Sequence, residues 1–364
     1  MLKRLEKGFK RVATSAIAAM LPEQQRGVRP DWRAREYRVL FLRHDRIGDM
    51  ILTTGILRAI AEAHPTVRLD VLASPINAPV VRHEPYLNEV IVFDRHAPAG
   101  YPRVVSELRR RRYDAVIDCM VTAPSLTTLL LMLATGAPYR IGAAARGNDF
   151  AYTLPVPPRE TAEHLVDQLG ALLTAFGLQP SAIDLQPRVR LTVEELERGE
   201  RAWAGETDDA PRRLRLLVNV SAGRGPRQWP DERFVAVVRA ALSARAGMDV
   251  AVVSSPSERG RAAMIAAESG ARVIEDHGFR DAMAIVARAD VVFTPDTSIA
   301  HAASAFGKPA VVLFVRDFAR VWGPYGTEGR SIESPTPQLD GIAADEAARA
   351  LVRLLERVEP ARPF

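Results

Sequence analysis

Apolar residues follow two alternating patterns along the chain. Short continuous apolar runs bounded by polar loops predict buried strands, and apolar residues spaced three and four apart predict helices. The expected strands are 38–42, 67–72, 89–93, 113–118, 139–141, 215–220, 248–253, 273–274, 289–293 and 310–314. The expected helices are one ending in the arginines of 109–112, one beginning near Ser298, and 50–63, 126–134, 164–176, 231–244, 258–269, 279–289 and 343–357. This alternation implies parallel sheets with helices on both faces.

Three stretches interrupt the alternation. Residues 155–160 read Pro-Val-Pro-Pro-Arg-Glu and predict a break, and residues 316–330 predict a loop. Residues 180–213 are rich in Pro, Glu, Arg and Asp, which is typical of a boundary between domains. We therefore predict two Rossmann-like domains in tandem, each binding its ligand at the carboxyl ends of its strands. The predicted parts are an N-terminal segment 1–35, a first domain 36–205, a second domain 206–340, and a C-terminal helix and tail 341–364.

Composition agrees with a two-domain soluble protein. The chain has 364 residues, of which 47% are apolar and 26% are charged. Cys119 is the single cysteine, so an intramolecular disulfide and a cysteine-based metal cluster are excluded. This usage fits a reducing, cytoplasmic compartment.

Positive charge is concentrated at the N-terminus. Residues 1–38 hold ten of the 49 Lys/Arg and four of the 44 Asp/Glu, which leaves 39 and 40 in the remainder. A domain-wide nucleic-acid footprint is therefore not expected. Apolar residues of 1–21 share one helical face, with Lys and Arg largely off it, which favours an interfacial helix on an anionic membrane. The alternatives are a helix packed on its own domain, an extension, or a signal peptide. No apolar run has the length of a transmembrane helix.

The stretch Asp296-Thr297-Ser298 lies between an expected strand and an expected short helix. All three are good helix N-cap residues. A helix N-terminus leaves unbonded N–H groups and the positive end of a dipole, which can hold a phosphate. His301 could reach the same place. The alternative is an ordinary helix cap followed by a buried histidine.

Two further features of the second domain point toward a nucleotide. The glycine-bearing loop 221–230 carries Arg224 and Arg227, and two cations beside a strand end could neutralise a leaving diphosphate without a metal. Glu258 begins a helix after the strand 248–253, where an acidic residue often binds ribose hydroxyls. The alternatives are a solvated loop and a helix N-terminal charge. Dinucleotide-binding and P-loop glycine patterns are absent from the sequence.

In the first domain, the loop 43–49 ends with Asp49 at an expected helix start. There Asp49 would cap the helix with a lowered pKa, or serve as a general base if a hydroxyl lies against it. Asp45 is its rival. The basic Arg43, His44 and Arg46 could meet an anionic acceptor or be solvated. The seven histidines are scattered without ligand-like spacing, so we predict no metal site.

Four stretches together resemble glycosyltransferase family 9, the ADP-heptose:lipopolysaccharide heptosyltransferases. They are Arg-His-Asp-Arg-Ile-Gly-Asp-Met-Ile-Leu-Thr-Thr at 43–54, the loop 223–230 ending Arg-Gln-Trp-Pro, Asp-Thr-Ser-Ile-Ala-His-Ala-Ala at 296–303 with Gly-Lys-Pro at 307–309, and Gly-Pro-Tyr-Gly at 323–326. The resemblance covers most of residues 38–357. It implies an α/β GT-B fold, in which two Rossmann-like domains face each other across a cleft.

The resemblance also implies an inverting, metal-independent transfer. The sugar, with heptose favoured, would move from a nucleotide-sugar donor, with ADP favoured, to a lipopolysaccharide-type or other glycan acceptor; no cofactor is implied. Asp49 matches the family's base. The implied donor-binding residues are Ser221, Arg227, Glu258, Asp296, Thr297, Ser298 and His301, and the implied acceptor-binding residues are Arg43, His44 and Arg46. Arg227 stands where the family usually has Lys, and Ser298 where it usually has Gly.

This reading places the enzyme in the cytoplasm, peripheral on the inner face of the cytoplasmic membrane. The basic N-terminus would bring it to the anionic leaflet, where a lipid-linked or oligosaccharide acceptor is built. Two other readings stay open. One is a GT-B-fold sugar-nucleotide epimerase, and the other is a non-catalytic relative that binds a sugar nucleotide or a partner protein.

Overall fold

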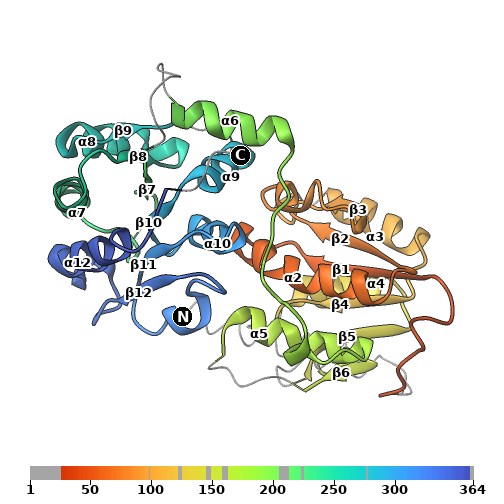
Figure 1. Cartoon of the computed structure of the whole chain (residues 1–364). Helices are drawn as coiled ribbons and strands as arrows, with labels where there is room; N and C mark the ends of the chain where they lie inside the picture. The colour runs from red at the N-terminus through yellow and green to blue at the C-terminus, as the bar shows by residue number, and fades with distance from the viewer. Residues whose placement is uncertain are drawn as a thin grey trace. The chain divides into compact units, whose positions relative to one another are not determined.

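The computed structural model describes residues 26–97, 99–121, 125–144, 149–157, 163–204, 213–222, 225–275 and 278–360. Residues 1–25 of the predicted N-terminal segment, and Arg224, lie outside this description. The chain divides into two compact units, Met1–Leu185 and Gln186–Phe364 (Figure 1). Among the described residues, no helix is long and apolar enough to cross a membrane.

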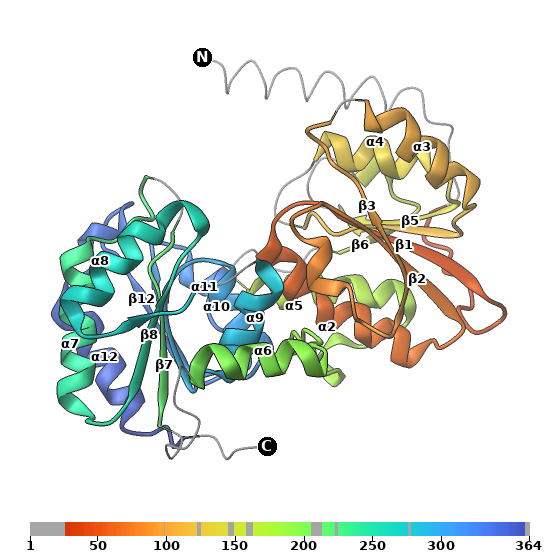
Figure 2. The same cartoon turned by 90° about the horizontal axis from the view of Figure 1, so that it is seen from above.

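The first unit is a parallel six-stranded sheet in the order β3-β2-β1-β4-β5-β6. Its strands are β1 Tyr37–Arg43, β2 Val67–Ala73, β3 Leu87–Val92, β4 Ala115–Asp118, β5 Tyr139–Ala143 and β6 Leu154–Val156. Its helices are α2 Ile47–Ala63, α3 Gly100–Arg110, α4 Leu126–Ala134 and α5 Leu165–Gly170, with 3-10 turns at Ala78–Val81, Asp149–Ala151, Ala171–Phe176 and Pro180–Ala182. Helices α3 and α4 cover one face of the sheet, and α2 and α5 cover the other (Figure 2).

The second unit repeats this plan in the order β12-β11-β10-β7-β8-β9, again all parallel. Its strands are β7 Arg215–Asn219, β8 Asp249–Val253, β9 Arg272–Val273, β10 Val291–Pro295, β11 Ala310–Phe314 and β12 Gly329–Glu333. Its helices are α6 Val193–Ala204, α7 Asp231–Ala244, α8 Arg259–Ser269, α9 Phe279–Arg288, α10 Ser298–Ala305, α11 Ala319–Trp322 and α12 Ala344–Leu355, with 3-10 turns at Pro256–Glu258 and Leu339–Gly341.

The central strands of both sheets are buried on both faces because their residues are almost all apolar. All five residues of β11, for example, are fully buried. In the second unit, the rings of Trp229, Phe234 and Phe293 meet in one cluster, with centroids 4.9 to 6.0 Å apart. The winding of each sheet reverses between its two central strands, β1 and β4 or β7 and β10. In doubly wound sheets ligands bind at this switch point, beyond the carboxyl ends of the strands.

The structure contains elements that the sequence pattern did not predict. Strand β6 lies where a break was expected; it pairs only with β5, and proline is tolerated in such an edge strand. The stretch expected to be a loop contains α11 and β12.

Helix α6 lies within the predicted boundary region. The Trp203 indole N–H donates to Ile285 O at 2.9 Å, and Arg280 forms an ion pair with Glu195, so α6 packs on α9. The two units therefore divide at residues 185 and 186 rather than at 205. Helix α12 packs against α7, β11 and β12 and belongs to the second unit rather than to a separate C-terminal part.

Candidate active site

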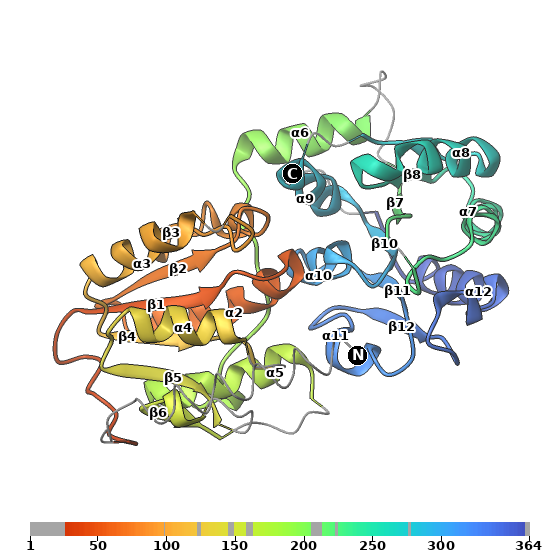
Figure 3. The same ribbon diagram turned by 180° about the vertical axis from the view of Figure 1, so that it is seen from behind.

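In the second unit, a turn joins β10 to α10 (Figure 3), and two of its backbone N–H groups are free. Thr297 is the N-cap, and its side chain accepts a hydrogen bond from Ile299 N at 3.3 Å. Asp296 was an alternative cap, but its own N–H donates to Leu313 O at 2.9 Å on the neighbouring strand. Within the described part of the chain, the N–H groups of Thr297 and Ser298 have no acceptor. They are therefore available to a phosphate at the helix N-terminus.

Asn219, the last residue of β7, joins this turn to the next strand. Its Nδ2 donates to Thr294 Oγ1 at 2.9 Å and to Thr297 Oγ1 at 3.1 Å. The same amide group bonds the backbone of Ser221, donating to its O and accepting from its N at 3.1 Å each. One buried side chain thus holds the carboxyl ends of the two central strands together, at the switch point.

Hydrogen bonds continue from Ser221 to Glu258. Ser255 N donates to Ser221 Oγ at 2.6 Å, and Ser255 Oγ donates to Glu258 Oε2 at 2.9 Å. The Arg261 guanidinium lies 3.4 Å from Glu258 Oε1. The structure therefore brings Ser221, Glu258 and Thr297 into one continuous network. Ser255 links this network, although the sequence analysis did not select it.

Arg227 reaches the same turn from the loop after β7. Its Nη1 lies 3.3 Å from Asp296 Oδ2, and its guanidinium lies 5.6 Å from the centre of the Phe318 ring. The Arg227 side chain keeps 34% of its surface exposed, whereas that of Asp296 keeps 9%. The structure therefore places a guanidinium beside this turn, where it forms an ion pair with Asp296.

His301 lies one helical turn beyond Thr297 and is 5% exposed. The centre of its ring lies 6.2 Å from that of Trp322. The structure places His301 within α10, the helix that follows the turn, and its predicted contact with the donor stays a prediction.

In the first unit, the end of β1 carries a buried cation. Arg43 is 2% exposed; its Nε donates to Thr53 Oγ1 at 2.9 Å and to Asp49 O at 3.2 Å. Its Nη1 donates to Cys119 O at 2.8 Å. Its Nη2 lies 3.9 Å from Asp49 Oδ1 and has no hydrogen-bond partner among the described residues.

Asp49 does not cap α2, because the helix begins at Ile47 and Arg46 is the N-cap. Asp49 lies in the first turn and is 8% exposed. The expectation of a lowered pKa is wrong. Burial raises the pKa of Asp49 to about 6, with a smaller contribution from Asp45, and the opposing effect of Arg43 does not cancel it. A carboxyl with this pKa can accept a proton near neutral pH.

The other basic residues of the loop differ in exposure. His44 is 2% exposed, its Nε2 lies 3.1 Å from Thr128 Oγ1 on α4, and burial lowers its pKa. Arg46 is exposed at the start of α2. Of the three residues predicted to bind an acceptor, only Arg46 therefore offers an open cation, and the acceptor assignment stays a prediction.

Besides Ser255, two residues that organise the site were not predicted from the sequence, Asn219 and Thr53. Asn219 could have been noticed as a polar residue ending a buried apolar strand. Thr53 gave no signal, because threonine is common in helices with one buried face. Within the ranges that the structure describes, no group of three or more His, Cys, Asp and Glu side chains is arranged to hold a metal.

Fold and site together define a class of protein. Two doubly wound units, one with unbonded N–H groups at a helix N-terminus beside its switch point and one with a buried carboxyl whose pKa is raised to about 6, are typical of an enzyme that acts on a nucleotide-linked substrate. Comparison with known proteins narrows this class. The family model described as glycosyltransferase family 9 (heptosyltransferase) matches residues 102–342. The chain belongs to this family and is a glycosyltransferase.

Known relatives align with most of this chain, in sequence and in structure. Lipopolysaccharide heptosyltransferase 2 of Escherichia coli (strain K12) is 22% identical over 304 residues, covering 76% of this chain and 82% of that protein. A glycosyl transferase family 9 structure from Veillonella parvula DSM 2008 superposes with a TM-score of 0.77 at 19% identity, covering 90% of this chain and 99% of that one. E. coli heptosyltransferase WaaC with ADP gives a TM-score of 0.67 at 17% identity, covering 88% and 98%. The predicted α/β GT-B fold is confirmed.

Proposed function

We propose that this enzyme transfers heptose from an ADP-linked donor to a lipopolysaccharide-type acceptor at the inner face of the cytoplasmic membrane. The names of the relatives support the sugar and the acceptor, and the ADP in the WaaC structure supports the nucleotide. The observation that carries the proposal is Asp49, a buried carboxyl in the first turn of α2 whose pKa is raised to about 6.

The reaction is a single displacement. Asp49 takes the proton of an acceptor hydroxyl, whose oxygen forms a bond to the anomeric carbon of the donor sugar. The bond from that carbon to the diphosphate oxygen breaks, and ADP leaves with the electron pair. One displacement inverts the anomeric configuration.

Negative charge grows on the leaving diphosphate, and the second unit supplies the groups to stabilise it. The N–H groups of Thr297 and Ser298 donate to its oxygens, and Arg227 adds a positive charge beside them. Glu258 and Ser221 hold the nucleoside end. We propose that transfer needs no metal, and treatment with EDTA should leave the rate unchanged; a loss restored by a divalent cation would contradict this.

Replacing Asp49 tests the proposal. Asp49→Asn keeps the shape of the side chain but cannot accept the proton, so kcat should fall by about 10² to 10⁴. Binding of ADP should stay within about twofold of wild type, because the turn after β10 is untouched. Transfer is measured with ADP-heptose and a heptose-deficient lipopolysaccharide acceptor, and binding by calorimetry.

Asp45→Asn is the matched control, because Asp45 is the other carboxyl of the same loop and should be the milder of the two variants. Full turnover in Asp49→Asn would remove Asp49 as the base. Conversion of the donor to a different sugar nucleotide without any acceptor would instead indicate an epimerase.

A further inference from the structure

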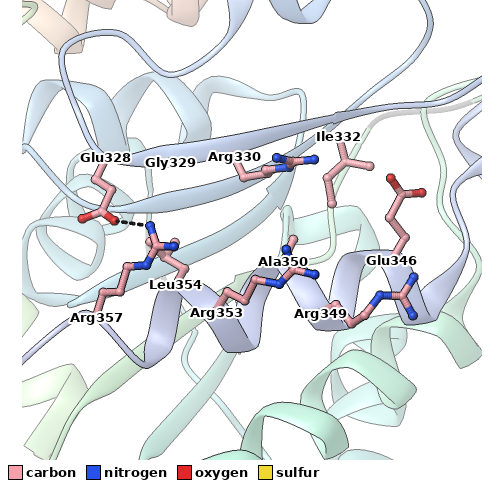
Figure 4. Close-up of a pocket in the computed structure, with 10 residues that line it drawn as sticks. All are labelled: Glu328, Gly329, Arg330, Ile332, Glu346, Arg349, Ala350, Arg353, Leu354 and Arg357. Carbon is pink, nitrogen blue, oxygen red and sulfur yellow. Dashed lines mark ion pairs between the residues drawn. The ribbon is translucent and has the colours of Figure 1, made fainter.

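A groove of about 400 Å³ lies between edge strand β12 and helix α12 of the second unit. Four arginines line it: Arg330 from the strand, Arg349 and Arg353 from successive turns of the helix, and Arg357 from just beyond the end of the helix (Figure 4). Ile332 and Leu354, both largely buried, also line it. None of these residues belongs to the sites for donor or acceptor.

The two acidic side chains of the groove lie at its ends (Figure 4). Glu328 forms an ion pair with Arg357 at 3.6 Å, and Glu346 lies at the start of α12. Arg330 and Arg353 lie between these ends, Arg349 lies below Glu346 (Figure 4), and all three are exposed. Among the described residues, the side chains of these three arginines form no ion pair and no hydrogen bond.

This arrangement is unfavourable without a counter-ion. Residues four apart on a helix are neighbours about 6 Å apart along the axis, and like charges at that spacing cost about 0.2–0.5 kcal/mol per pair. On a helix that only faces water, the like charges would all come from that helix. Here strand β12 adds the guanidinium of Arg330 on the opposite side of the groove, and the apolar Ile332 and Leu354 lie at its base.

We propose that this groove binds the phosphate group of an anionic ligand, between Arg330 on one side and Arg349 and Arg353 on the other. Guanidinium groups are planar and donate in pairs, a geometry that matches the oxygens of a phosphate. The apolar floor accommodates the carbon atoms next to a phosphate ester. The proposal does not depend on which sugar the enzyme transfers.

The first test uses soluble phosphates on the full chain. Saturating ADP first fills the donor turn, so that phosphate cannot bind there. Glycerol 3-phosphate is then titrated by calorimetry at constant ionic strength. The double variant Arg349→Gln/Arg353→Gln should bind at least tenfold more weakly than wild type.

The control is Arg103→Gln/Arg110→Gln on α3 of the first unit, which removes the same charge from two exposed positions. It should bind glycerol 3-phosphate like the wild type. Circular dichroism and melting temperature check that both double variants are folded.

The second test distinguishes a lipid headgroup from a free phosphate ester. Wild type and both double variants are sedimented with vesicles of phosphatidylglycerol and phosphatidylcholine, each also without residues 1–25 to remove the contribution of the basic N-terminus. Binding to anionic vesicles that falls at least fivefold only in the groove variant supports a lipid source. Binding of glycerol 3-phosphate without vesicle binding supports a soluble ester. Equal behaviour of groove and control variants in both tests overturns the proposal.

Discussion

Burial and Arg43 act on the Asp49 carboxyl in opposite directions. Burial favours the neutral acid and raises its pKa, whereas the positive charge of Arg43 at 3.9 Å favours the carboxylate. Asp45, Arg46 and the buried Asp118 at the end of β4 are the other charged groups of this region, and Asp45 raises the pKa further. Arg43 therefore keeps the base usable at neutral pH, a role different from the predicted contact with the acceptor.

Removing the Arg43 charge should shift the pH dependence of transfer. The base works only when deprotonated, so kcat/KM rises with pH through the pKa of Asp49, which lies at about 6. In Arg43→Gln this pKa should rise by about 1 unit or more, and the rising limb should move to higher pH by the same amount. Arg43→Lys keeps the positive charge and should leave the rising limb close to that of the wild type.

Carboxyl 13C NMR of the free enzyme measures the same pKa without any assay of activity, with Asp49→Asn to assign the signal. Arg46→Gln is the control, since this exposed charge is screened by water and its loss should move the limb far less. If the pH dependence of kcat/KM is unchanged in Arg43→Gln, Arg43 has a purely structural role.

Ser298 departs from the glycine usual in the family, and the structure explains why the helix tolerates it. Among the described residues, only Arg112 and Asp317 have a positive φ without being glycine. Ser298 is therefore not in the left-handed region, so its backbone conformation does not require glycine. Its N–H stays available to a phosphate, and only its side chain differs.

At the scale of elements, the donor turn depends on β7 holding β10 through Asn219. Asn219→Ala should remove the hydrogen bonds to Thr294 and Thr297 and loosen the N-cap, which weakens ADP binding about tenfold. Calorimetry measures this affinity. The control is Asn88→Ala on β3, which loses side-chain bonds to Asp70 and Arg68 in the first unit and should leave ADP binding unchanged. Normal ADP affinity in Asn219→Ala would show that the turn is rigid without its neighbour.

Strands and helices with long apolar runs could be predicted from the sequence, and those with few apolar residues could not. Strands such as β1 and β11 are continuous apolar runs, and both were predicted within a residue or two. Strand β12 has one buried residue, Ile332, and six of the 12 residues of α6 are charged, so neither has a continuous apolar run. The roles of Asp49 and the Asp296 turn stay predictions, and the burial that raises the pKa of Asp49 comes from tertiary packing and has no signal in the sequence.

At the scale of the molecule, each unit has a core of its own. One buried cluster, around Leu40 and Leu129, lies wholly in the first unit, and another, around Trp229 and Leu351, lies wholly in the second. Calorimetric melting should therefore show two transitions. ADP at a hundredfold excess over its Kd should stabilise only the second unit, by about 2.7 kcal/mol.

Hydrogen exchange with and without ADP assigns the transitions. Protection should increase in β7, β10 and α10 and stay unchanged in β1 and α2. A single transition that moves as a whole with ADP would show instead that the two units unfold cooperatively.

The bonds of Asn219 span 75 and 78 residues of chain, to Thr294 and Thr297. Contacts that are so distant in sequence form late in folding, because the entropy of closing the intervening loop must first be overcome. Partly folded forms of the second unit should therefore lack the donor site even when most of their helices are present. Affinity for the nucleotide then reports the completed fold. A newly synthesised chain binds its donor only after strands β7 and β10 have paired.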